Sequence, residues 1–285
     1  MSNPANPTAL PLLSHDVTIR AADAADMPGI RAIAIQHDIL RDWPRRPDFL
    51  DLERQTGRLL IAHSHAGVLG FAGTLTRGTV THLGDLFIHR QTQSAGLGAR
   101  LLAAILPPTG QPVVTFASAD PRALALYLRH GLLPRQPLWY LAGDPAALPV
   151  TTARLRRATV EQVADLDAEL SGGDRHGHLT WYARQPGVAV WSTPGGYAFT
   201  RTDNNSLTIG PAGGRAPHAS VDVVLAAADH ARTRRLQVRL AVFGTHPAAA
   251  VLIRAGLRIV DQDTFMTSHD QLLSVERYLP NPDLG

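Results

Sequence analysis

Residues 81–106 read THLGDLFIHRQTQSAGLGARLLAAIL and join a strand to a helix through a loop that carries two glycines. Residues 81–88, which end in Leu-Phe-Ile before a polar loop, predict the strand. The helix is predicted by apolar residues at helical spacing and a double-proline stop, namely Leu97, Leu101, Leu102, Ile105, Leu106, Pro107 and Pro108. Helix N-termini present unpaired backbone N–H groups, so this turn can accept a phosphate group. A two-glycine turn is also often only a turn.

Patterns on both sides of this stretch predict a mixed sheet with helices on its faces. The order is β-α-α-β-β-β-α-β-α-β, and its alternating later part requires crossover connections. The expected elements are strand 17–20, helix 25–35 with Asp23 as N-cap, hairpin strands 58–62 and 68–74, strand 113–116, helix 121–130 and strand 138–141.

The second half of the chain repeats the first. Ile19-Arg20-Ala21-Ala22 has a counterpart in Leu155-Arg156-Arg157-Ala158, and Tyr127-Leu128-Arg129-His130-Gly131-Leu132 is echoed by Leu252-Ile253-Arg254-Ala255-Gly256-Leu257. Both matches keep their place in the element order, which indicates a duplication. We expect a flexible N-terminus at 1–16, a first domain at 17–145, a linker at 146–152 inside a linker-like stretch from 142 to 152, and a second, diverged domain at 153–285.

Composition excludes several classes of site. The 285 residues are 45% hydrophobic and 18% charged, as in ordinary globular proteins, and the absence of cysteine excludes disulfides, thiolate metal sites and a cysteine nucleophile. All 27 basic residues are arginine, but the net charge is only +3. Residues 232–239 are interpreted as a solvated helix end rather than a nucleic-acid surface.

No secretory signal or apolar span of about 18 residues is present, so we expect a cytoplasmic protein without membrane contact. Two close histidine pairs occur, at 63 and 65 and at 176 and 178. Neither pair has further ligands at metal-binding spacing, so we expect no metal.

Two motifs in register resemble those of the GNAT acetyltransferases. Gln93-Ser94-Ala95-Gly96-Leu97-Gly98 is similar to the family's pyrophosphate loop, [Arg or Gln]-x-x-Gly-x-[Gly or Ala]. Tyr127 to Leu132 is similar to its later Tyr-x-x-x-Gly-[Phe or Leu] segment. The resemblance covers residues 17–141 well and implies an α/β (α+β) protein of two tandem GNAT-like domains, each a mixed, mostly antiparallel sheet flanked by helices. It also implies acetyl-CoA-dependent N-acetyl transfer.

The resemblance implies which residues bind acetyl-CoA. Backbone amides of the loop would hold the pyrophosphate, the strand before it would lie along the pantetheine arm, and a backbone N–H near Phe87 or Ile88 would polarise the thioester carbonyl. The implied cofactor residues are Leu86, Phe87, Ile88, Gln93, Ser94, Ala95, Gly96, Leu97, Gly98 and Ala99. Phe87 also suits plain core packing.

Acid and base are assigned from the same resemblance and from strand alternation. Tyr127 occupies the place of the family's general acid. The base is left open between His82 and Asp85. Strict alternation places His82 on the face of Leu86 and Ile88 and places Asp85 on the opposite face, so both cannot point inward. The pKa of a histidine suits proton removal near neutrality, although His82 also suits a surface position on a half-exposed strand.

The acceptor is expected over the loop between the first two helices. Asp38, Asp42 and Trp43 in this loop, with His37 and Arg45 beside them, could receive an amine from a small molecule or a protein. Trp43 could instead cap the end of the core. The sequence does not identify the acceptor.

The second half lacks the residues of the active pattern and resembles the C-terminal domain of bipartite family members. Leu252 stands at the tyrosine position and residues 218–223 at the loop position, while residues 210–214 offer a shifted phosphate loop. We expect this half to shape the acceptor site in a monomer built as an internal pseudo-dimer, with a homodimer possible. The alternatives are a non-catalytic acyl-CoA or ligand sensor, and an active site in the second half, which predicts that deleting residues after Thr152 abolishes acetyl-CoA binding.

Overall fold

The computed structural model describes residues 17–93 and 96–284. Its first half has the predicted order of elements. They are β1 (Thr18–Ala21), α1 (Met27–Gln36), α2 (Phe49–Thr56), β2 (Arg58–Ser64), β3 (Gly67–Arg77), β4 (Val80–Ile88), the 3-10 turn η1 (Arg90–Thr92), α3 (Leu97–Ile105), β5 (Val113–Ala117), α4 (Pro121–Arg129) and β6 (Leu133–Gly143). Strand β6 includes residues 142 and 143, which the sequence assigned to a linker.

The second half repeats the order of the first, which confirms a second GNAT-like copy. Its elements are η2 (Pro145–Ala147), β7 (Arg156–Arg157), α5 (Val160–Ser171), α6 (His176–Ala183), β8 (Val188–Thr193), β9 (Gly196–Asp203), β10 (Ser206–Gly214), α7 (Pro217–Thr233), β11 (Gln237–Phe243), α8 (Pro247–Arg254), β12 (Arg258–Thr267), β13 (Tyr278–Leu279) and η3 (Pro282–Leu284).

The strands form one continuous sheet in which the two halves exchange a strand. The order is β1-β2-β3-β4-β5-β12-β6-β11-β10-β9-β8-β7, and β13 pairs with β10. Strand β12 of the second half pairs with β5 of the first, with Thr264 opposite Ala117. Strand β6 of the first half pairs in turn with β11 of the second, with Leu141 opposite Leu240. Each half therefore completes its sheet with the last long strand of the other.

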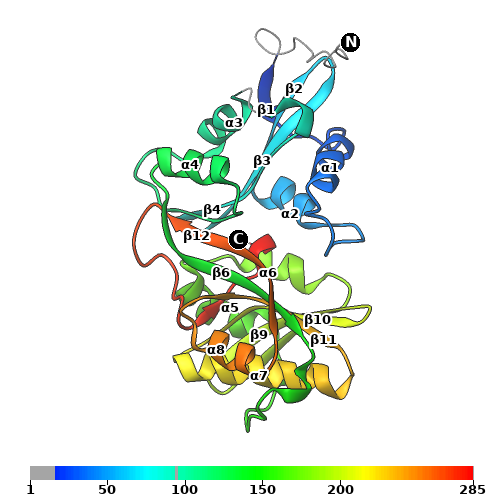
Figure 1. The fold of residues 1–285 in the computed structure, drawn as a ribbon, viewed down its shortest axis with the longest axis vertical. Coiled ribbons are helices and arrows are strands. Elements are labelled where there is room, and N and C mark those ends of the chain that lie inside the picture. Colours follow the sequence, from blue (N-terminus) through cyan, green and yellow to red (C-terminus); the bar gives the residue numbers. More distant parts are fainter. Residues whose placement is uncertain (1–16, 94–95, 285) are drawn as a thin grey trace, which may run out of the picture.

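The arrangement is symmetric about the β12–β6 pair. Strands β4 and β5 are parallel in one half, as β10 and β11 are in the other. Figure 1 shows β6 and β12 crossing between an upper part with α1 to α4 and a lower part with α7 and α8. The short turn η3 near the C-terminus packs against β4, so the end of the chain reaches the first half.

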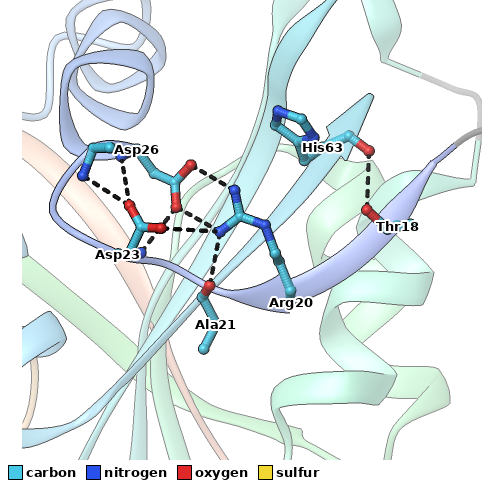
Figure 2. Close-up of polar contacts among 7 residues, drawn as sticks. Thr18, Arg20, Ala21, Asp23, Asp26 and His63 are labelled. Atoms are coloured by element: carbon cyan, nitrogen blue, oxygen red, sulfur yellow. Dashed lines mark hydrogen bonds and ion pairs between the residues drawn. The ribbon is translucent and has the colours of Figure 1, made fainter. Parts of the chain in front are cut away.

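The entry into α1 is held by an ion pair with the first strand. Arg20 of β1 donates two hydrogen bonds to the Asp26 carboxylate, at 2.6 and 2.8 Å (Figure 2). The predicted N-cap was wrong, because Asp26 occupies that position and α1 begins at Met27. The Asp23 side chain instead accepts from the backbone N–H groups of Ala25 and Asp26 in the preceding turn.

Among the described residues, the largest hydrophobic cluster is built from both halves. Aromatic rings from both halves pack at the seam, including Phe116, Phe243 and Phe265, whose centroids lie 5.0–6.1 Å apart. The second half also contains a buried ion pair, in which Arg175 donates to Asp167 at 2.7 and 2.8 Å. Burial of this pair is tolerated because Tyr197 donates to Asp167 and Arg175 donates to Tyr278.

Candidate active site

The loop between β4 and α3 ends in a glycine with left-handed backbone. Gly96 is the N-cap of α3 at φ 78°, and a Cβ there would meet nothing within 4 Å, so the backbone angle rather than space requires glycine. As a glycine, this N-cap residue has no side chain with which to cap the helix. The first backbone N–H groups of α3, those of Leu97, Gly98 and Ala99, lack intrahelical partners and can meet an anion. Ser94 and Ala95 lie outside the described residues.

Side chains beside the loop add polarity and charge. The Gln93 amide donates to the Ile88 carbonyl at 3.4 Å and accepts from Arg122 at 3.3 Å. Arg122, on α4, is also paired with Asp120 at 2.7 Å. The sequence had not singled out Arg122, because its approach depends on the packing of α4. The Leu97 side chain is buried, so only its backbone faces the loop.

A cleft opens where β4 and β5 part. The two strands pair through only three positions, ending with Leu83 opposite Thr115, whose hydroxyl donates to the Leu83 carbonyl at 2.8 Å. Beyond this point β4 continues to Ile88, while the other edge of β5 pairs with β12. The cleft has a volume of about 1000 Å³ and is lined by residues of the loop, α4, the α1–α2 connection and the second half.

Backbone alternation shows which amides face the cleft. The His89 N–H donates to the Leu69 carbonyl of β3 at 2.8 Å. In an antiparallel pair the hydrogen-bonded residues alternate, so Phe87 also faces β3, and the N–H groups of Leu86 and Ile88 face the parting. Of the two amides named from the sequence, Ile88 is therefore the one that points toward β5.

A β-bulge in β4 overturns the expectation that His82 and Asp85 lie on opposite faces. Asp85 is opposite Gly73 and Leu83 is opposite Thr74, so Gly84 is an extra residue in the ladder. The bulge shifts the alternation by one residue. His82, Asp85 and Phe87 consequently share one face. Leu83, with Leu86 and Ile88, packs on the other face against α3.

Asp85 is paired with a second buried carboxyl, that of Glu53 on α2. Glu53 is 1% exposed and Asp85 is 5% exposed. A Cβ at Gly73 or Gly84 would come within 1.8 or 2.7 Å of the Glu53 carboxyl oxygens, so these glycines make room for it. Burial raises the pKa of Glu53 well above its usual range, and the Asp85 charge raises it further. Burial also raises the pKa of Asp85 to about 7. The pair can hold a proton at neutral pH and exchange it with the cleft through Asp85.

Glu53 was not among the residues predicted from the sequence. Its position in the sequence could have indicated a functional role, because Glu53 is an acid on the apolar face of α2 beside Phe49, Leu50 and Leu52.

His82 is buried and neutral. It is 2% exposed, its ring lies 5.1 Å from that of Phe116, and its Nδ1 atom has no partner among the described residues. Burial lowers its pKa well below the usual value, and the charges of Arg77 and Arg175 act in the same direction. Of the two bases considered from the sequence, Asp85 has the pKa closer to neutrality.

Tyr127 lines the same cleft from α4. Its side chain is 6% exposed and packs with the residues beneath α3. Burial raises its pKa above the usual value, and the nearby charges of Asp85, Asp263 and Asp120 add to this effect. The phenol therefore stays protonated at neutral pH and is able to donate a proton.

The α1–α2 connection contributes one wall of the cleft. His37 Nε2 lies 3.0 Å from the Ile88 carbonyl oxygen, and Asp38 and Asp42 line the cleft. Trp43 does not line it, because its ring is buried between the halves. The Trp43 Nε1–H donates to Asp283 at 2.7 Å and the Arg201 guanidinium lies 4.2 Å from the ring centroid. Of the alternatives weighed for Trp43, the core position is the one observed.

The exchanged strands and the C-terminal turn form the opposite wall. The Tyr140 hydroxyl donates to Asp263 at 2.6 Å, and Arg239 pairs with Asp42. Burial raises the pKa of Asp263 to about 6, and the charges of Asp261 and Asp283 act in the same direction. These residues could not be found from the sequence, because their position depends on the strand exchange.

The corresponding place in the second half has no comparable loop. Strand β10 ends at Gly214 and α7 begins at Pro217, so residues 218–223 lie within a helix. Residues 210–214 lie in β10 rather than in a shifted phosphate loop, and a Cβ at Gly214 would come within 2.3 Å of the Ser220 nitrogen. Leu252 is buried on α8. Deletion after Thr152 would remove β12 from its place beside β5, so a loss of binding in that variant would not assign a site to the second half.

Two further properties concern the described residues only. Within 17–93 and 96–284, no group of three or more His, Asp or Glu side chains could hold a metal ion. No helix of these segments is long and apolar enough to cross a bilayer.

In the first half, the fourth and fifth strands of the sheet part beside a helix N-terminus that carries a glycine. The second half repeats this arrangement in reduced form. Together the two halves define a two-lobed GNAT fold. Residues 49–135 match the family model for an acetyltransferase (GNAT) domain. The chain therefore contains a GNAT domain within a bipartite GNAT-like fold.

Solved structures share this fold over nearly the whole chain. A candidate acetyltransferase from Pyrococcus horikoshii is 16% identical, with a TM-score of 0.76 over 97% of this chain and 98% of that one. A GCN5-related N-acetyltransferase from Sphaerobacter thermophilus is 16% identical, with a TM-score of 0.54 over 90% and 96%. A tandem GNAT protein from the clavulanic acid biosynthesis pathway is 15% identical, with a TM-score of 0.58 over 88% and 98%. A search of curated protein sequences gave no significant match.

Proposed function

We propose that the protein is an acetyl-CoA-dependent N-acetyltransferase that transfers the acetyl group directly to an amine, with its chemistry in the first half. One observation carries this proposal: the parting of β4 and β5 brings the Gly96 turn, the Asp85 carboxyl and the Tyr127 phenol to a single cleft.

The turn suits the diphosphate of acetyl-CoA. The left-handed Gly96 directs unpaired amides outward, none of the described side chains caps them, and Arg122 lies beside Gln93. Acetyl-CoA would supply the acetyl group as an activated thioester. Residues 86–88 and the loop residues named from the sequence remain the proposed contacts of this cosubstrate.

The residues of the cleft can then carry the proton transfers. Asp85, supported by Glu53, takes one proton from the ammonium group of the acceptor, because a pKa of about 7 suits proton removal near neutrality. The neutral amine then attacks the acetyl carbonyl carbon and forms the carbon–nitrogen bond, and its remaining extra proton is released to water. The amides of Leu86 and Ile88 stabilise negative charge on the acetyl oxygen. When the carbon–sulfur bond breaks, Tyr127 gives its proton to the departing sulfur. The proton on Asp85 returns the phenol to its neutral form through water.

The second half is proposed to shape the acceptor wall and to make a homodimer unnecessary. Support comes from β12 and β6, which place Asp263 and Tyr140 in the cleft of the first half. The protein would then act as a monomer built as an internal pseudo-dimer.

Turnover is tested by following free thiol while the full chain is incubated with acetyl-CoA and a panel of amines. We expect Tyr127→Phe to lower kcat by about 100-fold or more while the Kd for CoA stays constant. A sensor would bind CoA but release no thiol with any amine. Absence of CoA binding by well-folded protein would overturn the proposal.

A further inference from the structure

The acceptor side of the cleft carries carboxylates without cationic partners. Asp42 is paired with Arg239, Asp120 with Arg122, and Asp38 lies 3.9 Å from Arg41. Ion pairs to described residues are absent for Asp85, Asp261, Asp263 and Asp283, which also line the cleft.

Within the described residues no neighbouring cation forms an ion pair with these four carboxylates, and only the charge of Arg201 lowers the pKa of one of them, Asp283, whose pKa burial nevertheless raises. Arg129 lines the cleft but is exposed at the end of α4. Arg201 donates to the Asp42 carbonyl at 2.6 Å and stacks on Trp43. The cleft therefore holds an excess of negative charge.

This charge is built into the cleft rather than spread over the surface. Asp85 is buried against Glu53, Asp263 is half-buried and accepts from the Tyr140 hydroxyl, and Asp283 accepts from the Trp43 indole. These hydrogen bonds come from neutral groups. Acids held in a part-buried position by neutral donors keep an uncompensated charge, which a bound cation would offset. The raised pKa values of Asp263 and Asp283, each attributed first to burial, agree with this lack of compensation.

A second observation marks the inner end of the cleft as a ligand position. His82 is 2% exposed, lines the cleft, and leaves Nδ1 without a partner among the described residues. A buried ring nitrogen of this kind requires a polar partner, which an amine or its water can supply. His82 and Asp85 share one face of β4 and therefore mark where the reacting amine would lie.

The pairing of β4 and of β12 with β5 shows how Asp85, at the inner end of the cleft, lies relative to Asp263. Leu83 of β4 is level with Thr115 of β5, and Thr264 of β12 is level with Ala117, two residues further along β5. Asp85 and Asp263 thus lie at nearly the same height on the strands that flank β5. Two strand spacings amount to roughly 10 Å, which is a lower bound here because β4 has parted from β5 at this level, and the side chains reach inward from each strand. A short carbon chain suits a gap of this order.

We propose that the acceptor is a small diamine, whose reacting amine lies at Asp85 while its second, positively charged amine binds Asp263 and Asp283. This assignment rests on the proposed acetyl transfer and adds the class of acceptor to it.

The test compares three acceptors that present the same primary amine. Butylamine has an uncharged tail, 1,4-diaminobutane a cationic tail and 4-aminobutanoate an anionic tail. We expect kcat/KM to be at least about tenfold higher for the diamine than for butylamine, and lowest for 4-aminobutanoate, because one charged hydrogen bond changes binding by about this factor.

Asp263→Asn tests the assigned residue. We expect the ratio of kcat/KM for diamine over butylamine to fall about tenfold, mainly through KM for the diamine. Asp270→Asn is the matched control, because the Asp270 carboxylate is 78% exposed and lies outside the cleft. Both substitutions change the net charge of the protein by the same amount. The control should keep the wild-type ratio. Circular dichroism and the Kd for CoA verify that both variants are folded.

Each remaining outcome overturns a defined part of the proposal. Equal use of butylamine and the diamine, or an unchanged ratio in Asp263→Asn, would overturn the diamine assignment and leave acetyl transfer standing. Preference for a dibasic peptide over 1,3-, 1,4-, 1,5- and 1,6-diamines would overturn the small-molecule class. CoA binding without thiol release from any amine would overturn the proposed function itself, and the acceptor with it.

Discussion

Asp85→Asn is expected to stabilise the protein while removing most of its activity. In the unfolded chain an aspartate has a pKa near 3.8, whereas burial raises the pKa of Asp85 to about 7 in the fold. Below pH 3.8 both states are protonated and the residue has no effect. As pH rises from 3.8 to 7, the unfolded chain releases the proton and the folded protein retains it, so stability falls.

The size of this effect follows from the shift. Roughly three pKa units at about 1.4 kcal/mol each amount to about 4 kcal/mol of lost stability above pH 7. Asparagine carries no charge and can still hydrogen-bond Glu53, so the variant should recover most of this free energy. At pH 8 the gain in Tm should be on the order of 10 °C, and at pH 4 it should be close to zero.

Two measurements check this prediction. Thermal unfolding is followed at pH 4 and pH 8 for the wild type, Asp85→Asn and Asp270→Asn, the last as a control for net charge. Thiol release is measured with the best acceptor. A Tm gain of equal size at both pH values, a loss of stability at pH 8, or retained turnover would each refute the role given to Asp85.

Three further predictions concern the loop, the pH profile and the core. Gly96→Val should weaken CoA binding more than about tenfold, because a β-branched residue at φ 78° costs at least about 1–2 kcal/mol; calorimetry showing unchanged affinity would contradict it. The rate should rise as pH passes through about 7, where the Glu53–Asp85 pair becomes able to accept a proton; a flat profile from pH 6 to 8 would exclude this pair as base. Asp167→Asn should lower stability by about 3–5 kcal/mol, since Arg175 would lose the carboxylate of its buried ion pair; a Tm near the wild type would show that the charge is dispensable.

Much of the local structure was predictable because it depends on neighbours in the sequence. The period of the apolar residues at 97–106 predicted α3, and the second half followed the same order of elements. The Gly96 turn was recognisable because its backbone angle requires glycine. Domain boundaries and acceptor remain predictions.

Pairing between distant segments could not be predicted in the same way. Nothing near residues 133–143 in the sequence indicates that β6 pairs with β11 and β12 rather than with β5. The carboxylates of the acceptor wall were missed for this reason. The bulge was a different case, since an isolated glycine within a strand, here Gly84, is a known sign of a break in alternation.

The strand exchange has a consequence for synthesis on the ribosome. When α4 and β6 have emerged from the ribosome, the edge of β5 is still unpaired, because its partner β12 is translated more than a hundred residues later. Until then the nascent chain exposes an unpaired β-strand edge, a surface prone to pairing with other chains. The first lobe therefore cannot complete its sheet before the second lobe has been synthesised. The exposed strand edge would need protection by chaperones during translation.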